Sequence, residues 1–140
     1  MRELSAKILD PVVERFGPIE LTFAFVSPAL DREIRKSPPA NTSRAGDQHA
    51  GCELNSTGRP YCKRLGISCD FKAERVGSRI VAAWIAAKTE FDRLYWYGDS
   101  RPIHVSIGPD NSRIVWSAPY SGGHRALFSQ SDVFENLPHA

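Results

Sequence analysis

The chain has no run of apolar residues as long as the 18 or so that a membrane-spanning helix needs. Residues 1–17 carry a charge every few positions, so they lack the apolar core of a secretory signal peptide. Lysine and arginine total 18 against 16 acidic residues, and a net charge of +2 is too small to indicate nucleic-acid binding by charge alone. We therefore expect a cytoplasmic protein without membrane association, and nucleic-acid binding is not indicated.

Cysteine is scarce, and the odd number of 3 favours reduced thiols over a disulfide framework. The three are Cys52, Cys62 and Cys69, and a bridge between the first two stays open for an exported form. The sequence also contains no Gly-rich phosphate loop, no nucleophile elbow and no Cys-x-x-Cys pair. These absences exclude the common motif-based assignments for nucleotide hydrolysis and serine hydrolase chemistry.

A length of 140 residues fits a single domain, 1–140, with one hydrophobic core. Leu4, Ile8, Val12 and Phe16 recur every four positions and predict a helix that Gly17 and Pro18 end. Further helices are expected at 28–34, after a Ser27 cap, and at 76–87, where Val76, Ile80, Ala83, Trp84 and Ala87 would form the apolar face. Strands are expected at 19–26, where the strand should be buried, and at 67–72, 91–97, 102–107 and 112–118.

The remaining regions are a long loop at about 36–66, rich in Pro, Ser, Asn and Gly, and a C-terminal tail at about 118–140. A loop of that length inside a compact domain is usually functional or disordered. Helices and strands do not alternate strictly, and the short strands of the C-terminal half suit antiparallel pairing. We therefore predict the α+β class, with helices packed on a mainly antiparallel sheet.

Two residues with metal-binding side chains lie in strand-like segments, Asp70 in "GISCDF" and His104 in "RPIHVSIG". A catalytic divalent metal is commonly held by three imidazole or carboxylate ligands, with a fourth position left for water. Taken alone, His104 is more typical of a histidine whose hydrogen bonds are satisfied in the core or at the surface. The pair becomes a stronger candidate through a resemblance that extends along much of the chain.

The segments "ILDPVVERFGPIELTFAFVSPALDREI", "DQHAG", "GISCDF" and "FDRLYWYGDSRPIHVSIGP" resemble, in this order, the D-alanyl-D-alanine metallopeptidase family. This family comprises zinc carboxypeptidases and phage endolysins that share a fold with the Hedgehog signalling domain, and the resemblance covers roughly residues 4–108. Family members carry a Ser-x-His-x-x-Gly-x-Ala-x-Asp motif and a final His-Val-Ser strand. The two histidines and the aspartate of these motifs bind zinc.

The resemblance implies that Asp70 and His104 are zinc ligands. The compact family motif would place the first histidine at Lys63, and a lysine ammonium cannot bind zinc at neutral pH. If "DQHAG" matches the family's Ser-Gln-His instead, His49 is the third ligand and about fourteen residues have been inserted after it. We prefer His49, because a loop excursion between two fixed ends costs little free energy.

Two further functional residues of the family have no counterpart at the matching positions of this sequence. The arginine that helps to hold the substrate carboxylate falls on Val26, and the acidic general base has no counterpart in register, which leaves Asp99 and Glu53 as candidates. The resemblance therefore implies a divergent zinc-binding domain, either a hydrolase of a peptide or another amide bond or a non-catalytic module that binds a peptide, glycan or nucleotide. A rival site, a structural zinc on His49 and the three cysteines, has weak support from the spacing.

Overall fold

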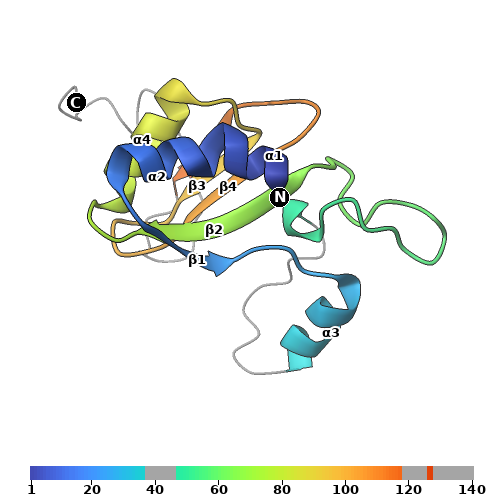
Figure 1. Cartoon of the computed structure of the whole chain (residues 1–140). Helices are drawn as coiled ribbons and strands as arrows, with labels where there is room; N and C mark the ends of the chain where they lie inside the picture. Colours follow the sequence, from blue (N-terminus) through green and yellow to red (C-terminus); the bar gives the residue numbers. More distant parts are fainter. Residues whose placement is uncertain (37–46, 118–125, 128–140) are drawn as a thin grey trace.

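The computed structural model describes residues 1–36, 47–117 and 126–127. It contains a six-stranded sheet in the order β1-β2-β4-β3-β5-β6 (Figure 1). The strands are β1 (Ile19–Phe23), β2 (Ile67–Ala73), β3 (Arg93–Trp96), β4 (Ile103–Ile107), β5 (Ile114–Ser117) and β6 (Ala126–Leu127). All neighbouring strands are antiparallel except β3 and β5, which are parallel. The sheet and its helices confirm the predicted α+β class.

The N-terminal helix is built from three consecutive segments, α1 (Arg2–Leu4), the π-helical η1 (Ser5–Leu9) and α2 (Asp10–Phe16). Leu4, Ile8 and Val12 have no exposed surface, so the predicted apolar face is confirmed. Gly17 ends the helix with a φ of 87°, and its N–H donates to the carbonyl of Val13. A residue with a side chain adopts that φ at a cost, which explains the glycine.

Two further helices lie close to their predicted positions. Helix α3 (Pro28–Lys36) begins after Ser27, whose Oγ accepts from the N–H of Leu30 as expected for a cap. Helix α4 (Ser78–Lys88) corresponds to the helix predicted at 76–87, but its predicted apolar face was wrong in part. Ile80 is 41% exposed, and the buried positions are Ser78, Val81, Ala82, Ile85 and Ala86. The helix is apolar nearly all round, so its pattern gives little information about which face is buried.

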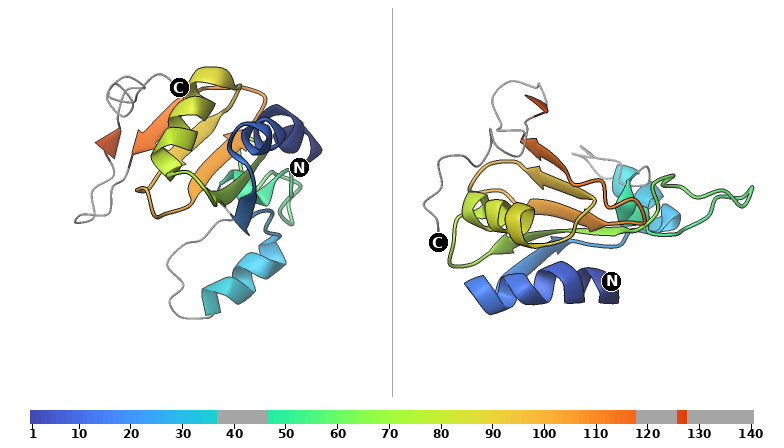
Figure 2. Two further views of the ribbon diagram at one scale, coloured as in Figure 1. Left: turned by 60° about the vertical axis from the view of Figure 1, so that its left-hand side comes forward. Right: turned by 90° about the horizontal axis from the view of Figure 1, so that it is seen from above.

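The hydrophobic core lies between one face of the sheet and two helices, the N-terminal helix and α4 (Figure 2). Alternate strand residues point to opposite faces. In β4, Ile103, Val105 and Ile107 join the core cluster with the helices, as do Cys69 and Phe71 in β2. The residues between them, including Asp70 and His104, therefore project from the opposite face.

Strand β1 corrects the prediction of a buried strand at 19–26. It is shorter than predicted, and its three central residues, Glu20, Leu21 and Thr22, are exposed. The reason is its place at one end of the strand order, where it pairs only with β2. β-branched and aromatic residues identify a strand, but they do not tell an edge strand from a central one.

The predicted long loop is an ordered excursion over its described part. The 3₁₀ turn η2 (Gln48–Ala50) is followed by a hairpin in which Leu54 pairs with Pro60, and the chain returns to β2 through Gly66 (Figure 1). Residues 37–46 of the loop, and the predicted tail at 118–140 apart from β6, lie outside the described residues. Across the described segments, the helices are too short or too polar to span a bilayer.

Candidate metal centre

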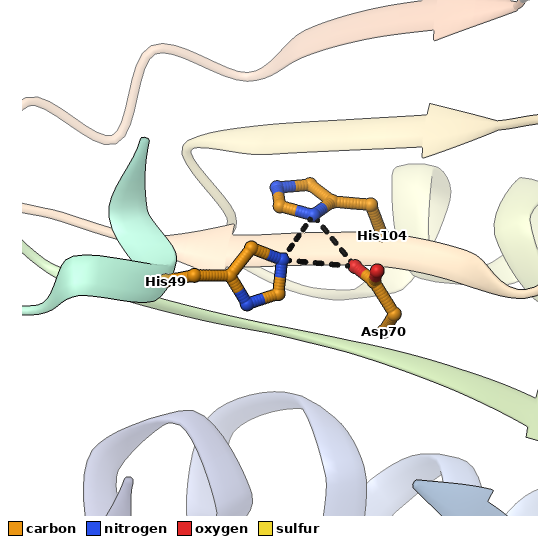
Figure 3. Close-up of side chains that lie close together, drawn as sticks. All are labelled: His49, Asp70 and His104. Carbon is orange, nitrogen blue, oxygen red and sulfur yellow. Dashed lines mark hydrogen bonds and ion pairs between the residues drawn. The ribbon is translucent and has the colours of Figure 1, made fainter. Parts of the chain in front are cut away.

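The register of β2 and β4 places Asp70 directly opposite His104. Both side chains project from the sheet face that the helices leave uncovered, and Asp70 Oδ1 lies 2.8 Å from His104 Nδ1 (Figure 3). The two residues that sequence motifs identified in separate strands are thus neighbours. Any substitution that shifted this register by one residue would move one of them to the core face.

His49 completes the cluster from a different element, the turn η2. Its Nε2 lies 3.1 Å from Asp70 Oδ1 and 3.2 Å from His104 Nδ1 (Figure 3). All three residues are buried, with exposures of 0%, 5% and 3% for His49, Asp70 and His104. Lys63, where the compact family motif would place the histidine, is exposed on the returning arm of the hairpin. The structure thus brings His49 to the pair from a position 21 residues before Asp70.

Short local hydrogen bonds fix the position of His49. Asp47 caps the turn by accepting from the His49 N–H at 2.8 Å. The N–H of Val26 donates to the His49 carbonyl at 2.9 Å, so the segment that follows β1 lies beside the turn. Val26 itself is fully buried, and its backbone holds the turn in place.

The hydrogen bond from the His49 ring to Ala24 identifies which ring nitrogen carries the proton. Nδ1 lies 2.8 Å from the carbonyl oxygen of Ala24, which can only accept, so Nδ1 must be the protonated nitrogen. In neutral His49 the lone pair is then on Nε2, where it faces the carboxylate of Asp70. Two acceptors at 3.1 Å repel each other unless a cation or an extra proton lies between them. Histidines that ligate metals commonly donate their other N–H to a carbonyl in this manner.

The carboxylate of Asp70 is ionised at neutral pH. Burial by itself would raise the pKa of Asp70, but the interactions of its carboxylate with the rings of His104 and His49 outweigh it. The pKa of Asp70 therefore lies well below the usual range of a carboxylic acid. A buried anion between two imidazoles is a suitable donor set for a divalent cation.

The spacing of the donor atoms fits a single metal ion. Zinc bonded at about 2.0–2.1 Å to nitrogen and oxygen in tetrahedral geometry separates its ligand atoms by about 3.3 Å. The three observed separations are 2.8, 3.1 and 3.2 Å, so small side-chain shifts would accommodate the ion. Among the described residues, this is the one group of three histidine, cysteine or acidic side chains close enough to share a metal. The described residues supply three ligands, which leaves one position of a tetrahedral ion open among them.

Aromatic rings flank both histidines. Tyr95, opposite His104 in the β3–β4 pair, stacks on its ring with centroids 4.6 Å apart and an interplanar angle of 15°. Phe23 contacts the His49 ring edge-on at 4.9 Å. These contacts restrict rotation of the two imidazoles. Sequence reasoning did not assign either aromatic residue to the site. Which residues of neighbouring strands lie opposite each other is known only from the register of the strand pairs.

The two candidates for a general base, Asp99 and Glu53, are not members of the ligand cluster. Asp99 Oδ1 accepts from the N–H of Arg79 at 2.9 Å, so its carboxylate caps helix α4, which packs on the other face of the sheet. Glu53 is half-buried in the hairpin, and its backbone bonds to Ala50 and Tyr61. Neither carboxylate belongs to the cluster formed by His49, Asp70 and His104. The structure thus assembles the predicted ligands, and it engages Asp99 in capping α4, while Glu53 lies four positions after His49 in the chain.

The rival zinc site on cysteines does not form in the described part of the chain. Cys52 is exposed, Cys62 and Cys69 are buried, and all three are free thiols outside the metal-binding group. Burial, together with the charge of Asp70, raises the pKa of Cys69 to about 12, so it remains a neutral thiol. Cys69 points into the core instead, as a small apolar residue.

Comparison of the chain with protein-family models, with curated proteins and with solved structures found no match. The resemblance to the D-alanyl-D-alanine metallopeptidases therefore remains a prediction from short motifs. The case for a metal centre consequently depends on the geometry of His49, Asp70 and His104.

Proposed function

We propose that the chain is a zinc-dependent hydrolase of a peptide or another amide bond, a divergent relative of the D-alanyl-D-alanine metallopeptidases. The observation that carries the proposal is the buried His49–Asp70–His104 cluster, in which the Ala24 carbonyl directs the His49 lone pair toward the other two ligands. Structural zinc sites are usually closed by four protein ligands, whereas three ligands are typical of catalytic zinc.

The roles of the residues follow from their positions. His49 Nε2, Asp70 Oδ1 and His104 Nδ1 would hold the ion. Zinc, when bound, polarises a carbonyl group and acidifies a coordinated water. Tyr95 and Phe23 orient the imidazoles by ring contact. Glu53, four positions after His49, is the candidate for accepting the proton of the attacking water, since Asp99 caps α4.

The assay that tests hydrolysis compares the zinc-loaded chain with the same protein treated with a chelator. Peptides ending in D-Ala-D-Ala and ordinary L-peptides serve as substrates, and release of amino groups is measured. We expect cleavage of at least one peptide class that stops on chelation and is absent from His104→Ala. Zinc binding without cleavage of any amide would contradict the hydrolase proposal.

A second function, a zinc-containing recognition domain without catalysis, is favoured by a specific observation. Asp99 is engaged by α4, and Val26 stands where the family has its substrate-binding arginine. The open coordination position would then bind a carbonyl or carboxylate of a peptide without cleaving it. Peptide binding that requires zinc, together with intact peptide after long incubation, would select this function.

A further inference from the structure

The side chain of Gln48, next to the proposed ligand His49, is buried between three segments of the chain. It is 1% exposed, and its Nε2 donates one hydrogen to the carbonyl of Leu65 at 2.8 Å and the other to Asp92 Oδ2 at 2.7 Å. Leu65 ends the hairpin, and Asp92 immediately precedes β3. Both N–H groups of one amide thus connect the turn η2 to the end of its own hairpin and to the sheet.

Asp92 is a rigid anchor for this amide. Its Oδ1 accepts from the N–H of Ser112 at 2.9 Å, and its backbone bonds to Ser106 in β4 and Ile114 in β5. Burial would raise the pKa of Asp92, but the hydrogen bonds from Ser112 and Gln48, with Arg93 nearby, lower it, so the group stays ionised. A hydrogen bond to a buried carboxylate is stronger than one between neutral groups.

Glycines create the space that the Gln48 amide occupies. A Cβ atom on Gly108 would lie 2.8 Å from Gln48 Nε2, too close for an unstrained contact. Gly66, with a φ of 87°, also has no room for a side chain. A Cβ atom added there would lie 2.0 Å from the carbonyl oxygen of Ile107. The ends of β2 and β4 therefore approach each other closely, and the amide fits against them.

A single 3₁₀ turn such as η2 has little stability of its own. On one side Val26 and Ala24 hold His49, and on the other side Gln48 attaches the turn to Asp92. We infer that Gln48 and Asp92 form a positioning pair that keeps His49 Nε2 at ligand distance from Asp70 and His104. This inference rests on the proposed zinc site. It also explains how about fourteen inserted residues leave the site intact, because the same amide joins the two ends of the insertion.

The test measures zinc affinity by competition with a chromophoric chelator, and the visible spectrum of the cobalt-substituted protein, for the full chain and its variants. Gln48→Leu keeps the volume of the side chain and removes both hydrogen bonds. We expect a 10- to 100-fold loss of zinc affinity, the usual effect of removing a partner that orients a ligand. The cobalt absorption bands should shift, because His49 is no longer held in one orientation.

Ser78→Ala is the matched control. Ser78 is also buried, and its Oγ makes two hydrogen bonds, to the Gly98 carbonyl and from Trp96 Nε1, but it lies on the helix-covered side of the sheet. We expect this variant to lose stability without a change in zinc affinity or cobalt spectrum. A merely structural role for Gln48 would give the same result as this control.

A second pair of variants covers the case in which Gln48→Leu does not fold. Gln48→Glu places a carboxylate against that of Asp92 and should weaken zinc binding. Adding Asp92→Asn restores a donor opposite the acceptor, so the double variant should recover at least part of the zinc affinity. If wild-type protein binds zinc and neither Gln48 variant weakens it more than twofold, the positioning pair is wrong and the zinc site stands. If wild-type protein binds no zinc, the proposed function itself fails.

Discussion

Asp70 on β2 and His104 on β4 face each other across an antiparallel pair, with Asp70 Oδ1 2.8 Å from His104 Nδ1. The register of two central strands fixes this contact, so the pair is as rigid as the sheet itself. His49, by contrast, comes from a single turn that side-chain and loop hydrogen bonds hold in place. The site thus combines two ligands set by the sheet with one that depends on local anchors.

The hydrogen bond to Ala24 predicts the tautomer of His49. In zinc-free protein with a neutral His49 ring, the Nδ1 atom should carry the proton and Nε2 should not, because a carbonyl oxygen can only accept. Long-range proton–nitrogen NMR correlations of the histidine ring distinguish the two tautomers. On adding zinc, the Nε2 resonance should shift most. A proton on Nε2 in the zinc-free form would mean that its lone pair does not face the cluster.

Zinc should stabilise the folded chain. A ligand that binds only the native state adds about 2.7 kcal/mol to the free energy of unfolding at a free concentration 100 times its Kd. Thermal unfolding with buffered zinc should therefore show a midpoint several degrees higher than with a chelator. His104→Ala should unfold at the same temperature in both conditions. If zinc raised the unfolding midpoint of His104→Ala as much as that of the wild type, the zinc would bind at another site.

Asp99 and Glu53 should respond differently to substitution. Asp99→Ala removes the carboxylate that caps α4 and should lower the free energy of unfolding by about 1 kcal/mol, with zinc affinity unchanged. Glu53→Gln should leave stability and zinc content nearly unchanged and reduce amide hydrolysis by a factor of about 10² or more. Urea unfolding, metal analysis and the peptide assay measure these effects. Hydrolysis that survives in Glu53→Gln would exclude Glu53 as the base.

Asp92 should stabilise the protein in a pH-dependent manner. Because hydrogen bonds lower the pKa of folded Asp92, its contribution is complete above the pKa of the unfolded chain, about 3.9, and is lost as the pH falls through the lower folded value. Wild type should therefore exceed Asp92→Asn in free energy of unfolding at pH 7 and pH 5, with a smaller difference at pH 3. Urea unfolding with a chelator present removes any effect of metal. A difference that grows toward acid pH would contradict the assignment.

The sequence predicted the three members of the His49–Asp70–His104 cluster better than their surroundings. Asp70 and His104 could be identified because each lies in a short motif within a strand, and His49 because "DQHAG" resembles half of a known motif. The anchors of His49 could not be predicted from the sequence. A buried amide such as that of Gln48 has no periodic signal, and its partner Asp92 lies 44 positions away in the chain. Contacts of this kind depend on tertiary packing, which motif order does not encode.

Strand pairing shows the same limit. The short strands of the C-terminal half suit antiparallel pairing, which is observed for β3 and β4, but β5 pairs with β3 in parallel. The prediction that β1 is buried was wrong, because composition does not show which strand lies at the edge of the sheet. The predicted class holds because it depends only on the kinds of elements and their order along the chain.

Zinc stoichiometry tests the metal centre most directly. The full chain is purified without added metal, reconstituted with zinc, freed of loosely bound ions, and analysed for metal beside His49→Ala, Asp70→Ala and His104→Ala. We expect one zinc ion per wild-type chain and almost none in each variant, with the variants still folded by circular dichroism. Wild-type protein without zinc, or a variant that keeps its full zinc content, would contradict the proposed site.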